Sequence, residues 1–229
     1  MPVAKSIKIL SGGAMRALLV EAVPLFDRAT GIKADVRFAL TSVLKKEIEG
    51  GAVFDVALLP RPELDALARH GSIDAGTQTD ITRSAVGLAV RAGAPKPDIG
   101  TVAAFKRTLL AAQTVGYSDG PSGAYVTDLL QRLGIAQEMK TKVRLTSGPV
   151  AELVAKGEAE IGLQQIVAIL PVKGAVLVGP LPPELQNIIV YAAGLSARNV
   201  NGQVARQFVA FMATPPAVQL IRTKGMEPA

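Results

Sequence analysis

The 229 residues are enough for one large domain or two of ordinary size. Hydrophobic residues make up 49% of the chain and aromatic residues only 4%, which predicts an aliphatic core. The chain has no cysteine and one histidine, His70, which excludes disulfides and Cys-ligated metal sites and argues against His-dependent catalysis. A net charge of +6 favours anionic ligands. The Lys and Arg residues are scattered and form no basic stripe with interleaved aromatics, so the pattern argues against a nucleic-acid partner.

The first third of the chain alternates between strand and helix patterns. We expect strands at 7–10, 32–38 and 54–59, and the third is an apolar run typical of a strand buried on both faces of a parallel sheet. A helix is expected over 14–29, after a turn at 11–13. The next helix is expected to be capped by Thr41-Ser42 and to end at Gly50-Gly51.

The middle of the chain repeats this order, and the end of the chain closes with two helices. Strands are expected at 85–90, 114–117, 143–145, 161–163, 176–178 and 188–193, and helices at 101–110, 124–133, 150–156, 201–212 and 215–222. The order predicts an α/β protein of two doubly wound units. No Gly-, Ser- or Pro-rich linker separates them, so we expect strands to connect the two units.

Five segments of the chain, taken in sequence order, resemble the type II periplasmic binding proteins, in particular their molybdate-binding-protein-like branch. The first is a strand, a small-residue turn and a helix start, and the last is a pair of helices before a Lys-Gly-Met-Glu-Pro ending. The segments are Ile9 to Met15, Gly50 to Val56, Gly116 to Tyr125, Lys156 to Gly162 and Ala205 to Pro228.

The resemblance implies a two-lobed fold with a ligand cleft between the lobes. Lobe one would comprise 1–82 plus 190–229 and lobe two 83–189, with a hinge of two chain crossings near Thr82-Arg83 and 188–191. The implied function is capture of a small anion, either an oxyanion or an organic carboxylate, for an ABC permease. The protein is expected to be a monomer and to need no cofactor or metal. No signal-peptide pattern precedes the first strand, so we expect either the mature form of a periplasmic protein or a cytoplasmic one. No apolar run reaches the ~18 residues that span a membrane.

Small and hydroxyl-bearing residues at the expected strand ends are the candidate ligand contacts. In open α/β sheets, ligands bind beyond the carboxyl ends of strands, where helix N-termini favour negative charge. The alternative for each of these turns is a plain cap or a plain turn. Ligand contacts are predicted at Ser11, Gly12, Gly13, Thr41, Ser42, Pro60, Arg61, Ser118, Ser122, Gly123, Tyr125, Gln164 and Gln165.

Gln164-Gln165 stands where molybdate binders typically have a Tyr, which favours a carboxylate at least as much as molybdate. Tyr125 is either a cleft residue or a half-buried core tyrosine, and His70 is expected to end a helix. Four arginines are candidates for carboxylate clamps, and Arg61, directly after the third strand, is the best placed. The four are Arg16, Arg61, Arg83 and Arg144.

Two other classes of protein share this resemblance. The stretch 90–98 and the Gln164-Gln165 pair resemble an aconitate isomerase subgroup, an enzyme on the same fold, for which Tyr117, Asp119 and Tyr125 would lie near the cleft. None of the three stands out as a general base. The effector domain of a LysR-type regulator also has this fold, but the chain lacks the accompanying helix-turn-helix.

Overall fold

The computed structural model describes residues 6–118, 121–198 and 201–229, without the side chains of Pro121 and Ser122. The chain divides into two compact units, which we call unit 1 (Met1–Arg83 with Ile189–Ala229) and unit 2 (Ser84–Ile188). Strand β4 (Thr79–Arg91) contributes to both units. Within the described ranges, no helix is both long and apolar enough to cross a membrane.

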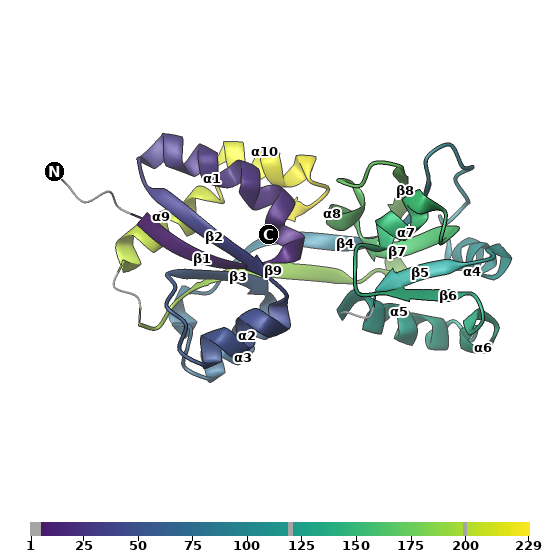
Figure 1. Cartoon of the computed structure of the whole chain (residues 1–229), viewed down its shortest axis with the longest axis horizontal. Helices are drawn as coiled ribbons and strands as arrows, with labels where there is room; N and C mark the ends of the chain where they lie inside the picture. Colours follow the sequence, from purple (N-terminus) through teal and green to yellow (C-terminus); the bar gives the residue numbers. More distant parts are fainter. Residues whose placement is uncertain (1–5, 119–120, 199–200) are drawn as a thin grey trace. The chain divides into compact units, whose positions relative to one another are not determined.

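Unit 1 contains a mixed sheet with helices on both faces. Strand β1 pairs in parallel with β2 and β3, and β9 pairs antiparallel with β3. Helices α1 and α10 cover one face, while α2 and α3 cover the other (Figure 1). The elements are β1 (Ser6–Gly12), a 3-10 turn (Gly13–Met15), α1 (Arg16–Thr30), β2 (Lys33–Ala39), α2 (Thr41–Glu49), β3 (Val56–Pro60), α3 (Arg61–Arg69), a 3-10 turn (Ala75–Thr77), β9 (Ile188–Leu195), α9 (Gly202–Phe211), α10 (Pro215–Thr223) and β10 (Glu227–Pro228).

Unit 2 has its own mixed sheet, in the order β8-β4-β7-β5-β6. Strand β5 is parallel to β6 and β7, whereas β4 is antiparallel to β7 and β8. Helices α4, α5 and α6 bury apolar side chains on one side, and α7 and α8 on the other. The elements are α4 (Val102–Ala111), β5 (Val115–Ser118), α5 (Pro121–Arg132), α6 (Ala136–Met139), β6 (Val143–Thr146), α7 (Val150–Lys156), β7 (Ile161–Gln165), α8 (Ile166–Ile169), β8 (Ala175–Pro180) and a 3-10 turn (Pro183–Leu185).

The predicted α/β class is confirmed, and so is the aliphatic core. Strand β3 is buried over its first four residues, as its apolar run indicates. Glycine ends two helices in the left-handed conformation that other residues avoid, at Gly31 (φ 72°) after α1 and Gly157 (φ 78°) after α7. In unit 1, Phe26 packs edge-on against Phe208 and Phe211.

Several expected strand boundaries were wrong, because pairing with a neighbouring strand extends the strand. Ser11 and Gly12 belong to β1, not to a turn, because they continue the parallel ladder opposite Phe38 and Ala39. The Gln164-Gln165 pair likewise ends β7 instead of following it, since it pairs with Gly87 and Val86 of β4. Strand β4 begins six residues before the expected start at 85, and the short helices α6 and α8 were not expected at all.

Candidate anion-binding edges

The carboxyl ends of β1, β2 and β3 lie at one edge of the unit 1 sheet, because the three strands are parallel and in register. A helical segment starts directly after each strand. The residue before each start is Gly12, Leu40 or Pro60, and none of these offers a side-chain cap. First-turn N–H groups without a side-chain cap are well suited to bind an anion.

The structure brings the β1 turn and the start of α2 together. A Cβ atom built on Gly12 would lie 3.3 Å from Oγ1 of Thr41, so the strand end and this hydroxyl are in contact. A Cβ on Gly13 would meet nothing within 4 Å, so the space beside this glycine is open. Thr41 and Ser42 are the first two helical residues, and the expectation that they cap α2 was wrong because Leu40 holds the cap position.

Ser11 has a different environment from its neighbours in the sequence. Its side chain is fully buried, and its hydroxyl lies 3.3 Å from the carbonyl oxygen of Leu58 on β3. The hydroxyl also lies 3.4 Å from the carbonyl of Gly12, a weaker arrangement. Ser11 therefore binds strand β1 to strand β3 within the sheet.

Arg16 opens α1 at this same edge. Its guanidinium carbon lies 4.3 Å from the centre of the Phe38 ring on β2, which is a cation–π contact. Among the residues that the structure describes, no carboxylate forms an ion pair with Arg16. The first turn of α1 also contains no acidic residue, so no carboxylate of this turn offsets the positive end of the helix or the guanidinium.

Arg61 opens α3 directly after β3, and its charge is neutralised. Its Nη1 donates to Asp80 at 2.7 Å, and its Nε donates to Asp65 at 2.9 Å. These hydrogen bonds, with Asp80 the stronger cause, raise the pKa of Arg61 above its ordinary value. Glu63 adds a third carboxylate in the first turn of α3. The best-placed clamp in the sequence is thus engaged within unit 1.

The remaining basic candidates are dispersed. Arg83 is exposed on β4, paired in register with Glu227. Arg144 donates from Nη1 to the carbonyls of Thr141 and Val143 in its own turn. His70 ends α3, as expected, and its Nδ1 lies 2.9 Å from Oγ of Ser72.

In unit 2, the parallel strands β5, β6 and β7 also end at one edge, and each is followed by a helix. Ser118 is the last residue of β5. The start of α5 lies so close to it that a Cβ on Gly123 would come within 1.5 Å of the Ser118 carbonyl oxygen, which only glycine permits. Asp119 and the side chain of Ser122 lie outside the described residues.

The two glutamines have different environments. Oε1 of Gln164 accepts a hydrogen bond from the N–H of Ala151 at 3.1 Å, so Gln164 caps the start of α7 from the neighbouring strand. Gln165 is half-buried in the cap position of α8 and is also engaged in an interaction. One member of the pair therefore has a structural role.

The tyrosines of unit 2 contribute to its core. The Tyr125 hydroxyl donates to the carbonyl of Leu185, and its ring packs against the main apolar cluster of the unit. Tyr117 is buried in that cluster, and its hydroxyl lies 3.5 Å from Oγ1 of Thr127. The half-buried core alternative considered for Tyr125 matches these contacts.

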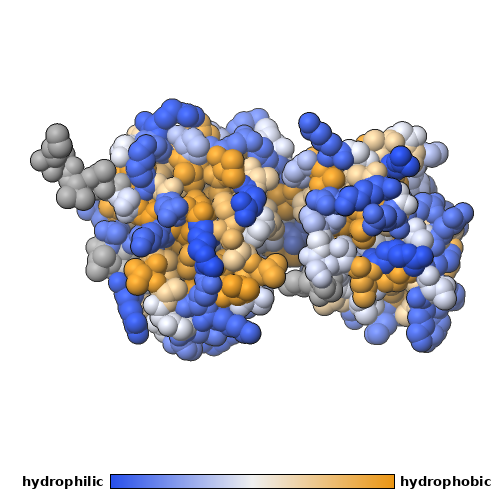
Figure 2. Space-filling model, viewed as in Figure 1, coloured by the Kyte–Doolittle hydropathy of each residue, from blue (hydrophilic) through white to orange (hydrophobic). Residues whose placement is uncertain are grey.

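Sequence reasoning missed two features of these edges. The Thr146 to Pro149 turn joins β6 to α7 and is closed by a 2.9 Å hydrogen bond from the N–H of Gly148 to Oγ1 of Thr146. Its strand–hydroxyl–glycine–helix order is the signal that identified the other turns. Apolar side chains also reach the surface (Figure 2), among them Leu40 at 70% exposure and Leu145 at 61%. No local pattern marked them, because their exposure depends on the packing around them.

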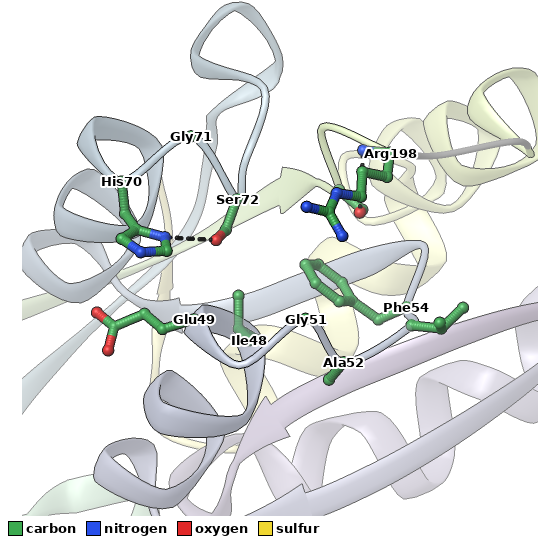
Figure 3. A pocket seen from close by; sticks show the side chains of 11 residues that line it. Ile48, Glu49, Gly51, Ala52, Phe54, His70, Gly71, Ser72 and Arg198 are labelled. Atoms are coloured by element: carbon green, nitrogen blue, oxygen red, sulfur yellow. Dashed lines mark hydrogen bonds between the residues drawn. The ribbon is translucent and has the colours of Figure 1, made fainter.

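A cavity of about 190 Å³ lies elsewhere in unit 1 (Figure 3). It is lined by the last residues of α2, the loop that follows them, the end of α3 and the loop after β9. Arg198 brings positive charge, whereas Glu49 and the C-terminal ends of two helices bring negative charge. This cavity is at the opposite end of α2 and α3 from the strand edge, and its mixed electrostatics favour neither sign of ligand.

Comparison with known proteins identifies the family. The sequence profile of the bacterial extracellular solute-binding proteins matches residues 7–227. An aconitate isomerase from a Pseudomonas species is 31% identical over 97% of this chain and 88% of its own.

Solved structures are similar in fold. The substrate-binding domain assigned to a molybdenum ABC transporter of Clostridium difficile has a TM-score of 0.82 at 15% identity, over 98% of this chain and 99% of its own. The periplasmic molybdate-binding protein of Azotobacter vinelandii has a TM-score of 0.78 at 18% identity, over 96% and 98%. The chain belongs to the bacterial extracellular solute-binding protein family and has the type II periplasmic binding protein fold.

Proposed function

We propose that this protein captures a small anion, an oxyanion or an organic carboxylate, and delivers it to an ABC permease. The observation that carries the proposal is the start of α1. Here an arginine, a helix N-terminus and two glycines coincide, the first turn of α1 has no acidic residue, and no ion pair joins Arg16 to a carboxylate of the described residues. Thr41 adds a hydroxyl in contact with the same turn. Such a cluster raises the local concentration of anions and supplies directed donors to them.

Unit 2 contributes neutral donors in this proposal. The start of α5 and the Thr146 to Pro149 turn lie at the carboxyl edge of its sheet. Backbone N–H groups and hydroxyls suit an anion that has already been selected by charge. The family membership supports a periplasmic location.

Titration calorimetry tests the proposal directly. The full chain is titrated with molybdate, tungstate, sulfate, citrate and trans-aconitate, each against a matched chloride control. We expect heat of binding with at least one of these anions, and loss of that heat in Thr41→Ala combined with Ser42→Ala. The absence of binding to every anion of the panel would contradict the function.

A second candidate is an isomerase of a tricarboxylic acid, and the observation that favours it is the aconitate isomerase relative at 31% identity. The test is proton NMR of cis-aconitate incubated with the protein, in which formation of the trans isomer at a rate proportional to protein concentration would establish the enzyme. Binding of aconitate without interconversion would favour a transport role.

A further inference from the structure

We propose that unit 2 contains a binding site of its own, a cavity beneath helix α5 that takes a small neutral molecule with an apolar body and one hydrogen-bond acceptor. The inference does not depend on the anion-binding function proposed above, because the cavity lies among the core elements of one unit. Three observations carry it: the size of the cavity, the weakly bonded hydroxyl of Tyr117 on its wall, and the apolar surface beside it.

The cavity has a volume of about 200 Å³. Its walls come from β5, β6, the C-terminal half of α5 and α6, which lie close together in unit 2 (Figure 1). Native cores leave few voids larger than a water molecule, and a cavity of roughly 150 Å³ already holds a benzene-sized molecule. Ala136, at the start of α6, contributes only a small side chain to the wall. Thr127 and Lys140 are exposed, so the cavity opens to solvent and a single-ring molecule can enter it.

The hydroxyl of Tyr117 lacks a good hydrogen-bond partner at this wall. The residue is only 6% exposed, and among the described residues its hydroxyl has one hydrogen-bond contact, 3.5 Å from Oγ1 of Thr127. That distance exceeds the roughly 3.0 Å of ordinary hydroxyl pairs. Oγ1 of Thr127 donates its single hydrogen to the carbonyl of Gly123 at 3.0 Å, so it has none left for Tyr117. A buried hydroxyl in this state costs free energy, which an acceptor on a bound ligand would recover.

The chemistry of the walls determines the class of ligand. Leu130 and Val143 offer apolar surface, and of the described residues no Asp or Glu lines the cavity. The buried donor, Tyr117, is an uncharged hydroxyl, whereas the ammonium of Lys140 lies at the exposed rim, where water and salt screen its charge. A neutral acceptor such as a carbonyl oxygen, carried on an aromatic ring, matches one buried donor above an apolar wall.

Apolar surface continues from the cavity onto strand β6, at the edge of the unit 2 sheet. Val143 and Leu145 are two residues apart on this strand, so their side chains lie on the same face. Leu145 pairs in register with Tyr117 and is 61% exposed. The apolar body of a ligand in the cavity can therefore be larger than a single ring and cover part of this leucine.

The experiment is an NMR titration of the full chain that follows the backbone amide shifts. The probe is benzamide, and acetamide, toluene and benzoate lack its ring, lack its acceptor and add a charge, respectively. Ala136→Leu fills the cavity, and Tyr117→Phe removes only the hydroxyl. The matched control, Ala103→Leu, makes the same enlargement on an exposed residue of α4 outside the cavity. Circular dichroism establishes that each variant is folded, and Tyr117→Phe provides the test if Ala136→Leu does not fold.

We expect benzamide to shift the amides around the cavity, such as those of Leu130 and Val143, in a saturable way. Ala136→Leu should weaken this binding by roughly tenfold or more because the added side chain occupies the ligand's space. Ala103→Leu should leave it within about twofold. Tyr117→Phe should weaken benzamide by about fivefold, the effect of one lost neutral hydrogen bond, and leave toluene binding unchanged. Benzoate should bind in the cavity no more tightly than benzamide.

The other outcomes would overturn the site or one part of its description. Benzamide shifts that are absent around the cavity, or that persist unchanged in folded Ala136→Leu, would mean that the cavity holds only water. Acetamide binding as tight as that of benzamide would overturn the apolar body, and tighter binding of benzoate would overturn the neutral class. An equal loss of toluene and benzamide binding in Tyr117→Phe would overturn the role of the hydroxyl. Each of these results leaves the anion-binding function standing, since none of them involves the strand edges.

Discussion

Helices α1 and α3 start near the same edge of the same sheet, and each has an arginine as its first residue. Helix α3 follows β3 directly, whereas the 3-10 turn Gly13–Met15 lies between β1 and α1. They differ in charge compensation. Arg61 on α3 is held by Asp65 and Asp80, whereas Arg16 on α1 stacks on Phe38 and forms no ion pair with a carboxylate in the described chain. The position of a helix start makes an anion site possible. The surrounding carboxylates determine whether the charge of the arginine there is available to a ligand.

The largest effect on anion affinity is expected when the first turn of α1 receives an acidic residue, as the first turn of α3 already has. Ala17→Glu places a carboxylate in the first turn of α1, as Glu63 does in α3. We expect citrate affinity to fall by roughly 100-fold because the new charge neutralises Arg16 and repels the ligand. Thermal stability without ligand should hold or rise slightly, since an acid near a helix N-terminus is favourable.

Calorimetry and a thermal melt of the same sample measure both effects. Ala17→Gln, which adds the same bulk without charge, is the control and should keep most of the affinity. A variant that binds citrate as the unmodified chain does would show that the start of α1 is not the anion site.

The next largest effect is expected at Thr41, whose hydroxyl lies beside the turn before α1. Thr41→Ala removes the group that lies next to Gly12 and should weaken citrate binding by about tenfold, the effect of one lost hydrogen bond to a charged ligand. Thr41→Ser retains the hydroxyl and should restore most of the affinity, as isothermal calorimetry would show. Equal losses in both variants would point to packing of the methyl group instead.

Helix α7 differs from α1 and α3 because a side chain, that of Gln164, caps its first turn. Gln164→Leu leaves the N–H of Ala151 without its 3.1 Å acceptor and should lower the free energy of unfolding by about 1 kcal/mol. Urea denaturation measures this change. The control is Gln207→Leu on the exposed surface of α9, which should change stability less. Equal stability in the two variants would mean that Gln164 is not a cap.

The smallest effects are expected at α3. Arg61→Gln should leave citrate affinity within about threefold, because the guanidinium is already committed to two carboxylates. Both ion pairs are partly exposed, so its free energy of unfolding should fall by less than about 1 kcal/mol. A loss of citrate affinity as large as that of Ala17→Glu would show that the ion pairs open to receive the ligand.

The sequence predicted the fold class because its signals are local. An apolar run such as that of β3 depends on a few neighbouring residues, and the structure has this strand buried as expected. Helix ends such as those at Gly31 and Gly157 depend on the glycine itself. Boundaries that depend on a partner strand were missed. Gln164 and Gln165 belong to β7 only because β4 pairs with them, and no pattern within 161–165 reveals that partner.

Local patterns therefore predict the α/β class, the order of most strands and helices, and the turns at which an anion can meet a helix N-terminus. The fold determines which of those turns retains its charge. Arg16 and Arg61 both follow a predicted strand or turn, and only the fold brings Asp80, 19 residues along the chain, to Arg61 and the ring of Phe38 to Arg16. Charge compensation acts over a few ångströms in space, whatever the separation in sequence, and so it cannot be inferred from local pattern alone.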